Sequence, residues 1–122
     1  MSEIRATTIS DAAGTGPITL TKQQAAKAWV NYVADGTQSI NDSFNIASIT
    51  DSGVGLTLAT LSSSMLNDNY CATTGAWDGG YYLGISTGST KSSSTCLFAF
   101  GNNANTQTDA NEASGLIHGD LA

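Results

Sequence analysis

The alternation of apolar and polar residues is clearest between Ser43 and Leu61. Apolar residues recur at every second position on both sides of a short polar segment, residues 50–53, whose aspartate and glycine suit a tight turn. A period of two is typical of a strand with one buried face, so the sequence predicts a β-hairpin here. Because a two-stranded ribbon alone is only marginally stable in water, the rest of the chain must supply further strands.

Other segments do carry strand patterns, separated by turns rich in Gly, Asp, Asn and Ser. About seven or eight short strands with turn signals between them are typical of an antiparallel β-sandwich or a barrel-like domain. Residues 101–113 are polar and lack periodicity, so they are expected to form a surface loop. The expected strands cover residues 28–33, 39–49 with an interruption near Asn41 and Asp42, 54–60, 69–77, 81–86, 95–100 and 114–121.

Residues 22–33 allow two interpretations. Thr21 to Gln24 matches a helix-capping box, and the apolar residues that follow fall on one helical face. Residues 28–33, however, are dense in aromatic and β-branched side chains, which favour strands. We expect a helical turn or two over residues 21–27 followed by a strand over residues 28–33, and the sequence leaves both alternatives open.

The first 20 residues show no sustained pattern. Ile4, Ile9 and Ile18 are isolated among Thr, Ala and Gly, and residues 11–17 have the composition of a loop. Such a segment cannot bury enough apolar surface to fold alone, so a neighbouring subunit or an anchoring partner must order it. The predicted organisation is an extended N-terminal attachment arm, residues 1–21, followed by one all-β head domain, residues 22–122.

Composition and charge narrow the classes of partner. Of the 122 residues 11% are charged, against about 25% in an average domain. This suits β-structure whose polar faces are lined by Ser and Thr, or surfaces that pack against other chains. The net charge is −6, and the four basic residues are dispersed, so a nucleic-acid groove is not expected. No apolar run reaches the length of a membrane span, and the N-terminus has no recognisable leader, so we expect a soluble chain without membrane insertion.

Several segments resemble the C-terminal β-rich module of tail fibres and related appendages of tailed bacteriophages, especially marine and cyanobacterial phages. Their order along the chain is shared, and residues 9–20 also resemble the leaders of such fibre proteins. The segments are Lys27-Ala-Trp-Val-Asn-Tyr32, Ser43-Phe-Asn-Ile-Ala-Ser-Ile-Thr-Asp51, Asn69-Tyr70 and Gly119-Asp-Leu-Ala122.

The resemblance implies a virion structural protein, made in the cytoplasm of the bacterial host and assembled as a homotrimer. Fibres of this kind carry a long shaft between leader and head, whereas here only a few residues separate the two. The chain is therefore expected to be a short tail fibre or spike, or a head-fibre or decoration subunit. Its arm would dock on other virion proteins of the tail, portal or capsid, and its head could contact the host surface.

No cluster of residues predicts catalysis or metal binding. His118 is the only histidine, and Asp120 is the only potential companion on the same strand face, which favours a surface or interface residue. Asp109 and Glu112 are placed in the expected loop without the second positioned carboxylate that glycoside hydrolysis requires. We therefore expect no enzyme activity, no cofactor and no metal.

Aromatic residues divide into two groups. Trp77, Tyr81 and Tyr82 flank a glycine-rich turn, so they are candidates for a receptor surface or a subunit interface. This group motivates an alternative function, a carbohydrate-binding or adhesin-type module that binds a host surface glycan through the loops at residues 77–82 and 101–113. The group expected in the core comprises Trp29, Tyr32, Phe44, Phe98 and Phe100.

The two cysteines, Cys71 and Cys96, fall on separate expected strands. A disulfide across a sheet and two buried free thiols are both compatible with these positions, and we favour the thiols.

Overall fold

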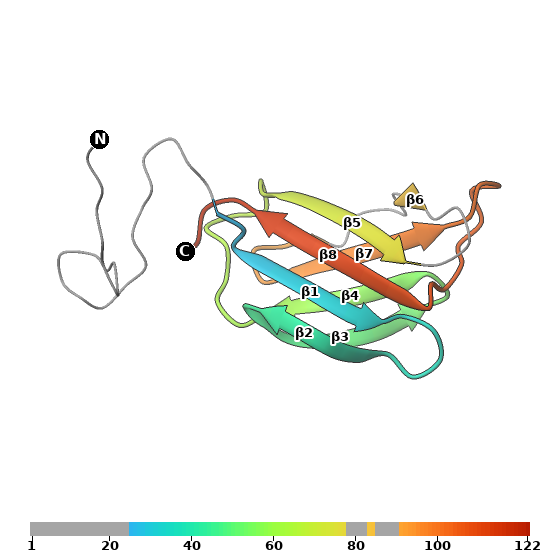
Figure 1. Cartoon of the computed structure of the whole chain (residues 1–122). Coiled ribbons are helices and arrows are strands. Elements are labelled where there is room, and N and C mark those ends of the chain that lie inside the picture. The colour runs from blue at the N-terminus through green and yellow to red at the C-terminus, as the bar shows by residue number, and fades with distance from the viewer. Residues whose placement is uncertain (1–24, 78–82, 85–90) are drawn as a thin grey trace, which may run out of the picture.

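The computed structural model describes residues 25–77, 83–84 and 91–122, and within these residues the chain forms strands, turns and loops but no helix (Figure 1). Correspondingly, this part of the chain contains no helix that could cross a membrane. The strands are β1 (Ala28–Val33), β2 (Ser39–Phe44), β3 (Ile46–Gly53), β4 (Leu56–Leu61), β5 (Cys71–Trp77), β6 (Leu83–Gly84), β7 (Thr95–Gly101) and β8 (Glu112–His118).

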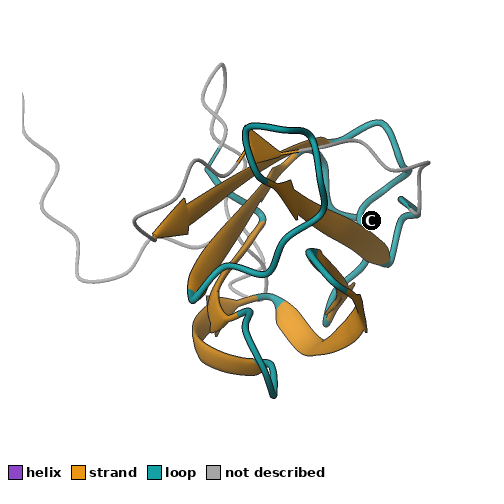
Figure 2. Cartoon of the chain, turned by 90° about the vertical axis from the view of Figure 1, so that its right-hand side faces the viewer, coloured by secondary structure: helices purple, strands orange, loops and turns teal. Residues whose placement is uncertain are grey.

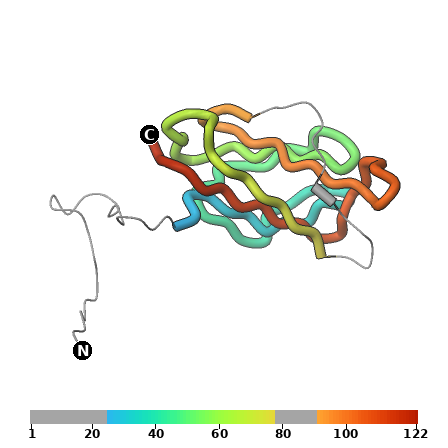
Figure 3. Tube along the Cα trace, turned by 90° about the horizontal axis from the view of Figure 1, so that it is seen from above, coloured from blue at the N-terminus to red at the C-terminus, as the bar shows by residue number. Residues whose placement is uncertain are grey.

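The strands form two four-stranded antiparallel sheets. Sheet A has the order β2-β1-β8-β5, and sheet B has the order β3-β4-β7-β6. The sheets lie in two layers (Figure 2 and Figure 3), and β8 runs between β1 and β5 in sheet A (Figure 1). The predicted all-β sandwich is confirmed.

The chain passes from sheet A to sheet B at Asn45. This residue adopts a φ of 56°. Its side-chain nitrogen, Nδ2, donates to the backbone carbonyl oxygens of Lys27 at 3.0 Å and Ser63 at 3.1 Å. Its side-chain oxygen accepts from the Ser63 amide at 2.7 Å. Asparagine tolerates the left-handed conformation and bonds nearby backbone, which explains its place at this corner. The interruption expected near Asn41 and Asp42 does not end β2, which continues to Phe44, but it coincides with a register irregularity that leaves Asn41 without a register partner in β1. The expected run over residues 39–49 divides at Asn45 instead.

The predicted hairpin is confirmed as the β3–β4 pair, but its turn lies later than expected. Strand β3 extends to Gly53, and Gly55 has a φ of 67°. The Gly55 amide donates to Oδ1 of Asp109 at 2.6 Å, and a Cβ at Gly55 would lie 2.5 Å from the Phe100 carbonyl oxygen. Both the positive φ and the lack of space require glycine at this position, which fixes the turn there.

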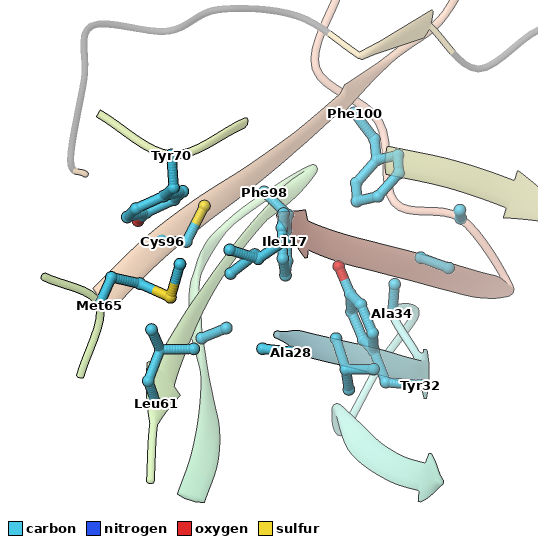
Figure 4. Close-up of a cluster of buried hydrophobic side chains, with 14 residues drawn as sticks. Ala28, Tyr32, Ala34, Leu61, Met65, Tyr70, Cys96, Phe98, Phe100 and Ile117 are labelled. Carbon is cyan, nitrogen blue, oxygen red and sulfur yellow. The ribbon is translucent and has the colours of Figure 1, made fainter. Parts of the chain in front are cut away.

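The core lies between the two sheets, where large side chains from β1, β7 and β8 point toward one another (Figure 4). The inward positions alternate with half-exposed ones along β1 and β4, as the period of two predicts. The buried side chains of the strands include Val30, Tyr32, Ala59, Leu61, Cys96, Phe98, Phe100, Ala113 and Ile117.

The expected core was correct for Tyr32, Phe98 and Phe100 but wrong for Trp29 and Phe44. Trp29 is half-buried and Phe44 is 54% exposed, and the two lie opposite each other across β1 and β2. Trp29 and Tyr32 are three residues apart, a spacing that shares a face on a helix and separates faces on a strand. Because β1 buries Tyr32, Trp29 and its cross-strand neighbour Phe44 must face outward.

Two further expectations are settled by the strand boundaries. Residues 28–33 form β1, and residues 25–27 are not helical, while residues 21–24 lie outside the described part of the chain. The last strand begins at Glu112 and ends at His118, earlier than the expected 114–121. Glu112 therefore belongs to a strand and not to the loop in which it was placed.

The two cysteines are both free. Cys96 on β7 is buried, as the favoured interpretation predicted, but Cys71 on β5 is exposed. A disulfide between them is not formed, and the expectation of two buried thiols is right for one cysteine only.

Candidate functional site

The outer face of sheet A brings together the side chains best placed to bind another molecule. Because directly opposed residues of antiparallel strands share a face, the strand register defines rows of neighbours across this surface. Three such rows run from β5 through β8 and β1 to β2, and they are Thr73-Leu116-Trp29-Phe44, Gly75-Ser114-Asn31-Asp42 and Trp77-Glu112-Val33-Ser39.

Two adjoining hollows lie over these rows, and we call them together the outer groove. They have volumes of about 410 Å³ and about 320 Å³ and share Asn31, Gly75 and Ser114 in their linings. Trp29 and Leu116 line the first hollow, whereas Trp77 and Glu112 line the second. The shared residues belong to the middle row, where Gly75 has no side chain and Ser114 has a small one, so the sheet surface is low between the larger side chains.

A chain of side-chain hydrogen bonds crosses one side of the outer groove. The Asn41 amide donates to Oδ1 of Asn31 at 2.9 Å, and the Asn31 amide donates to Oε1 of Glu112 at 2.6 Å. These bonds fix the orientation of the Asn31 amide and of the carboxylate. An amide group has two donor hydrogens and a carboxylate has about four lone-pair sites, so both keep capacity to bind a polar ligand.

Trp77 ends β5 beside this network and is 83% exposed. A tryptophan normally buries most of its large apolar surface, so an indole left in solvent next to oriented polar groups is typical of a binding surface. The structure thus places Trp77, one of the candidate receptor residues, on the rim of the outer groove. Tyr81 and Tyr82 lie outside the described residues, as do the arm residues Ile4, Ile9 and Ile18.

The charge of the outer groove is low. Glu112 is the one ionisable side chain among the described residues that line the two hollows. Together with the net charge of −6, this carboxylate disfavours phosphate-rich or other anionic ligands. The groove is therefore suited to a neutral molecule that offers both hydroxyl groups and an apolar surface.

Sequence reasoning identified Trp77 but missed the polar part of this surface. Asn31 and Glu112 are distant in sequence and become neighbours only because β1 pairs with β8. The available signal was the period of two along β1. Because Val30 is buried, its neighbours Trp29 and Asn31 face outward on the same side of the strand.

The remaining sequence candidates do not form a catalytic or metal site in the described residues. His118 lies opposite Cys71 across β8 and β5, but no group of three or more His, Cys, Asp and Glu side chains gathers there or elsewhere in this part of the chain. Oδ1 of Asp109 accepts a hydrogen bond from the Gly55 amide, so this carboxylate has a structural role at the β3–β4 turn. Burial raises the pKa of the Cys96 thiol, so this cysteine is a poor nucleophile.

Comparisons with models of protein families, with curated proteins and with solved structures found no match to this chain. Since a β-sandwich hosts many unrelated functions, the fold alone does not assign one.

Proposed function

We propose that this chain is a non-catalytic virion subunit of a tailed bacteriophage, with the β-sandwich as its head and residues 1–21 as its docking arm. It would act as a short tail fibre or spike, or as a head-fibre or decoration subunit. The sequence resemblance motivates the proposal, and the observation that carries it is the outer face of sheet A. Of the twelve residues in its three rows, only Asp42 and Glu112 are charged.

A face with so few charges can be covered by another protein without removing many charges from water. The described strands of both sheets begin at Ala28, after the proposed arm. Attachment and folding can therefore be separated, because the arm can change while the strand order of the head stays the same.

An arm deletion tests this proposal. Removing residues 1–20 should leave the head folded, as judged by circular dichroism, and should abolish its incorporation into phage particles, as judged by mass spectrometry of purified virions. The full-length Leu66→Ala variant, changed at an exposed apolar residue outside the three rows, is the control and should be incorporated normally. Normal incorporation of the truncated protein would refute the docking role of the arm.

The outer groove favours a second candidate function, the binding of a neutral glycan. A sugar ring has an apolar face that can lie on an indole and hydroxyl groups that can bond to amides and carboxylates. Trp77 supplies the exposed indole, and Asn31 and Glu112 supply the oriented polar groups beside it. The same subunit could then attach to the particle and contact a host surface glycan.

Glycan-array screening, followed by calorimetry with the best neutral oligosaccharide, tests the second candidate. Trp77→Ala and Asn31→Ala should each weaken binding by about tenfold or more, since loss of about 1.4 kcal/mol of contact has this effect. Leu66→Ala is the control, because Leu66 is also a large exposed apolar residue, at 61%, and does not line the groove. Absence of glycan binding, or equal affinity of Trp77→Ala, would refute glycan recognition and leave the docking proposal untouched.

A further inference from the structure

The four edge strands of the sandwich differ in how they are protected from pairing with other chains. An edge strand presents unpaired N–H and C=O groups that can bond to a strand of another chain. Proteins usually prevent this pairing with charged residues, proline, bulges or a short strand. Strand β2 carries Asp42 and has a register irregularity at Asn41 in its pairing with β1. Strand β3 carries Asp51 and has two irregularities in its pairing with β4. Strand β6 is only two residues long. Each of these three edges has at least one protective feature.

Strand β5 has none of them. It spans seven residues, Cys71 to Trp77, without a charged residue or a proline. Its register with β8 is continuous over the whole length, so no bulge bends it. Among the described strands, β5 is therefore the long, regular and uncharged edge, which is the type that pairs with another strand.

We propose that β5 pairs with β5 of a second copy of this chain, antiparallel and about a twofold axis at Thr74. All seven residues can then pair, with Thr74 opposite itself and Thr73 opposite the partner's Gly75. Sheet A becomes a continuous eight-stranded sheet across two subunits. The contact is isologous, meaning that the same surface is used on both sides, so assembly stops at a dimer.

Self-pairing accounts for two exposed side chains at once. In this register Cys71 lies opposite the partner's Trp77, and directly opposed residues share a face. The 83% exposed indole would cover an exposed thiol in each half of the contact. Sulfur and aromatic rings attract one another, so the pair is favourable as well as apolar.

The absence of charge on β5 argues for a second copy as the occupant. Two chains that each carry a net charge of −6 repel one another, and this edge is a place where they can approach without opposing acids. Pairing through β2 or β3 would instead bring Asp42 or Asp51 into the contact. The inference is independent of the virion proposal, and it predicts a dimer where the sequence resemblance implies a trimer.

The first test is the native mass of the full-length protein, measured by light scattering over a dilution series. We expect a dimer. Thr73→Lys should weaken it by about tenfold or more, because a lysine enters the middle of an uncharged strand pair. Thr50→Lys, the same substitution on the exposed edge strand β3, is the matched control and should leave the dimer unchanged. A monomer at every concentration, a stable trimer, or a Thr73→Lys dimer of normal affinity would overturn the proposal.

Disulfide trapping tests the register and does not depend on the stability of the lysine variant. In a Cys71→Ser background, Thr74→Cys should form a covalent dimer on oxidation, because Cα atoms of opposed residues lie within the range that a disulfide spans. Thr73→Cys in the same background should not, since it would face the partner's Gly75. Cys96, at 3% exposed, does not compete. Equal cross-linking of the two variants, or none, would overturn the pairing.

Trp77 takes part in both the glycan proposal and the self-pairing proposal, so the two need separate measurements. Thr73 lines the groove, so its variants are not used for this purpose. Glycan affinity measured on the unmodified protein, at a dilution where light scattering shows a monomer, reports the outer groove alone. Cross-linking of Thr74→Cys in the absence of glycan reports the strand pair alone.

Discussion

Two glycines on neighbouring strands of sheet A show how differently its two faces are used. Gly115 on β8 faces the core, where a Cβ would lie 2.3 Å from Cζ of Phe98. Gly75 on β5 lines the outer groove, where the nearest atom to a Cβ would be Oγ of Ser114 at 3.1 Å. Inside, a ring from the opposite sheet fills the place of the missing side chain, since interiors are close-packed. Outside, the corresponding space remains open and can accept a ligand.

The largest effect on the free energy of unfolding is expected from removing a large side chain from the core. Phe98 is 1% exposed and its ring contacts the β8 backbone at Gly115. Phe98→Ala should lower the free energy of unfolding by about 3–5 kcal/mol, because it removes buried surface and leaves a cavity. Urea unfolding monitored by circular dichroism measures this. A loss below about 1 kcal/mol would mean that the ring does not hold the two sheets together.

A pH-dependent effect is expected from Tyr32, whose side chain is fully buried and whose hydroxyl has no well-aligned hydrogen-bond partner among the described residues. Burial raises the pKa of Tyr32 to about 12, and the neighbouring Thr57 side chain offsets a part of this shift. The unfolded chain loses this proton near pH 10, so the contribution of the neutral phenol to stability is complete below pH 10 and is lost as pH rises toward 12.

The corresponding loss is about 2–3 kcal/mol by pH 12, since one pKa unit corresponds to about 1.4 kcal/mol. Tyr32→Phe should flatten the dependence of urea stability on pH in this range. Some dependence should remain, because burial also raises the pKa of Tyr70. An unchanged pH profile in the variant would show that Tyr32 does not titrate in the unfolding transition.

A smaller loss is expected from adding a methyl group to the inner glycine. Gly115→Ala should cost about 1–3 kcal/mol through overcrowding of the Phe98 ring. Gly75→Ala is the matched control on the outer face, and it should cost less because the contact there is with one serine hydroxyl. Equal losses in thermal or urea unfolding would show that the two faces are packed alike, which would contradict the contrast drawn above.

The sequence predicted the fold class because strand periodicity and turn residues are local signals. It predicted β1, β5 and β7 closely for the same reason. It misplaced Trp29, which is three residues before the buried Tyr32. Residues three apart share a face on a helix but lie on opposite faces of a strand. It could not locate the outer groove, because the contact between Asn31 and Glu112 depends on which strands are neighbours, a long-range property that β1 and β8 alone do not encode.

The smallest effect on stability is expected from Trp77. At 83% exposed it buries little surface within the subunit. In the Thr73→Lys background, diluted until light scattering shows a monomer, Trp77→Ala should change the free energy of unfolding by about 0.5 kcal/mol or less. Urea unfolding at low protein concentration measures this. A loss as large as that of Gly115→Ala would show that the indole packs within its own subunit, and both roles proposed for it would then fail. A small loss would mean that natural selection of tryptophan here has to be explained by contacts outside the folded monomer, with a glycan, with a second copy, or with both in turn.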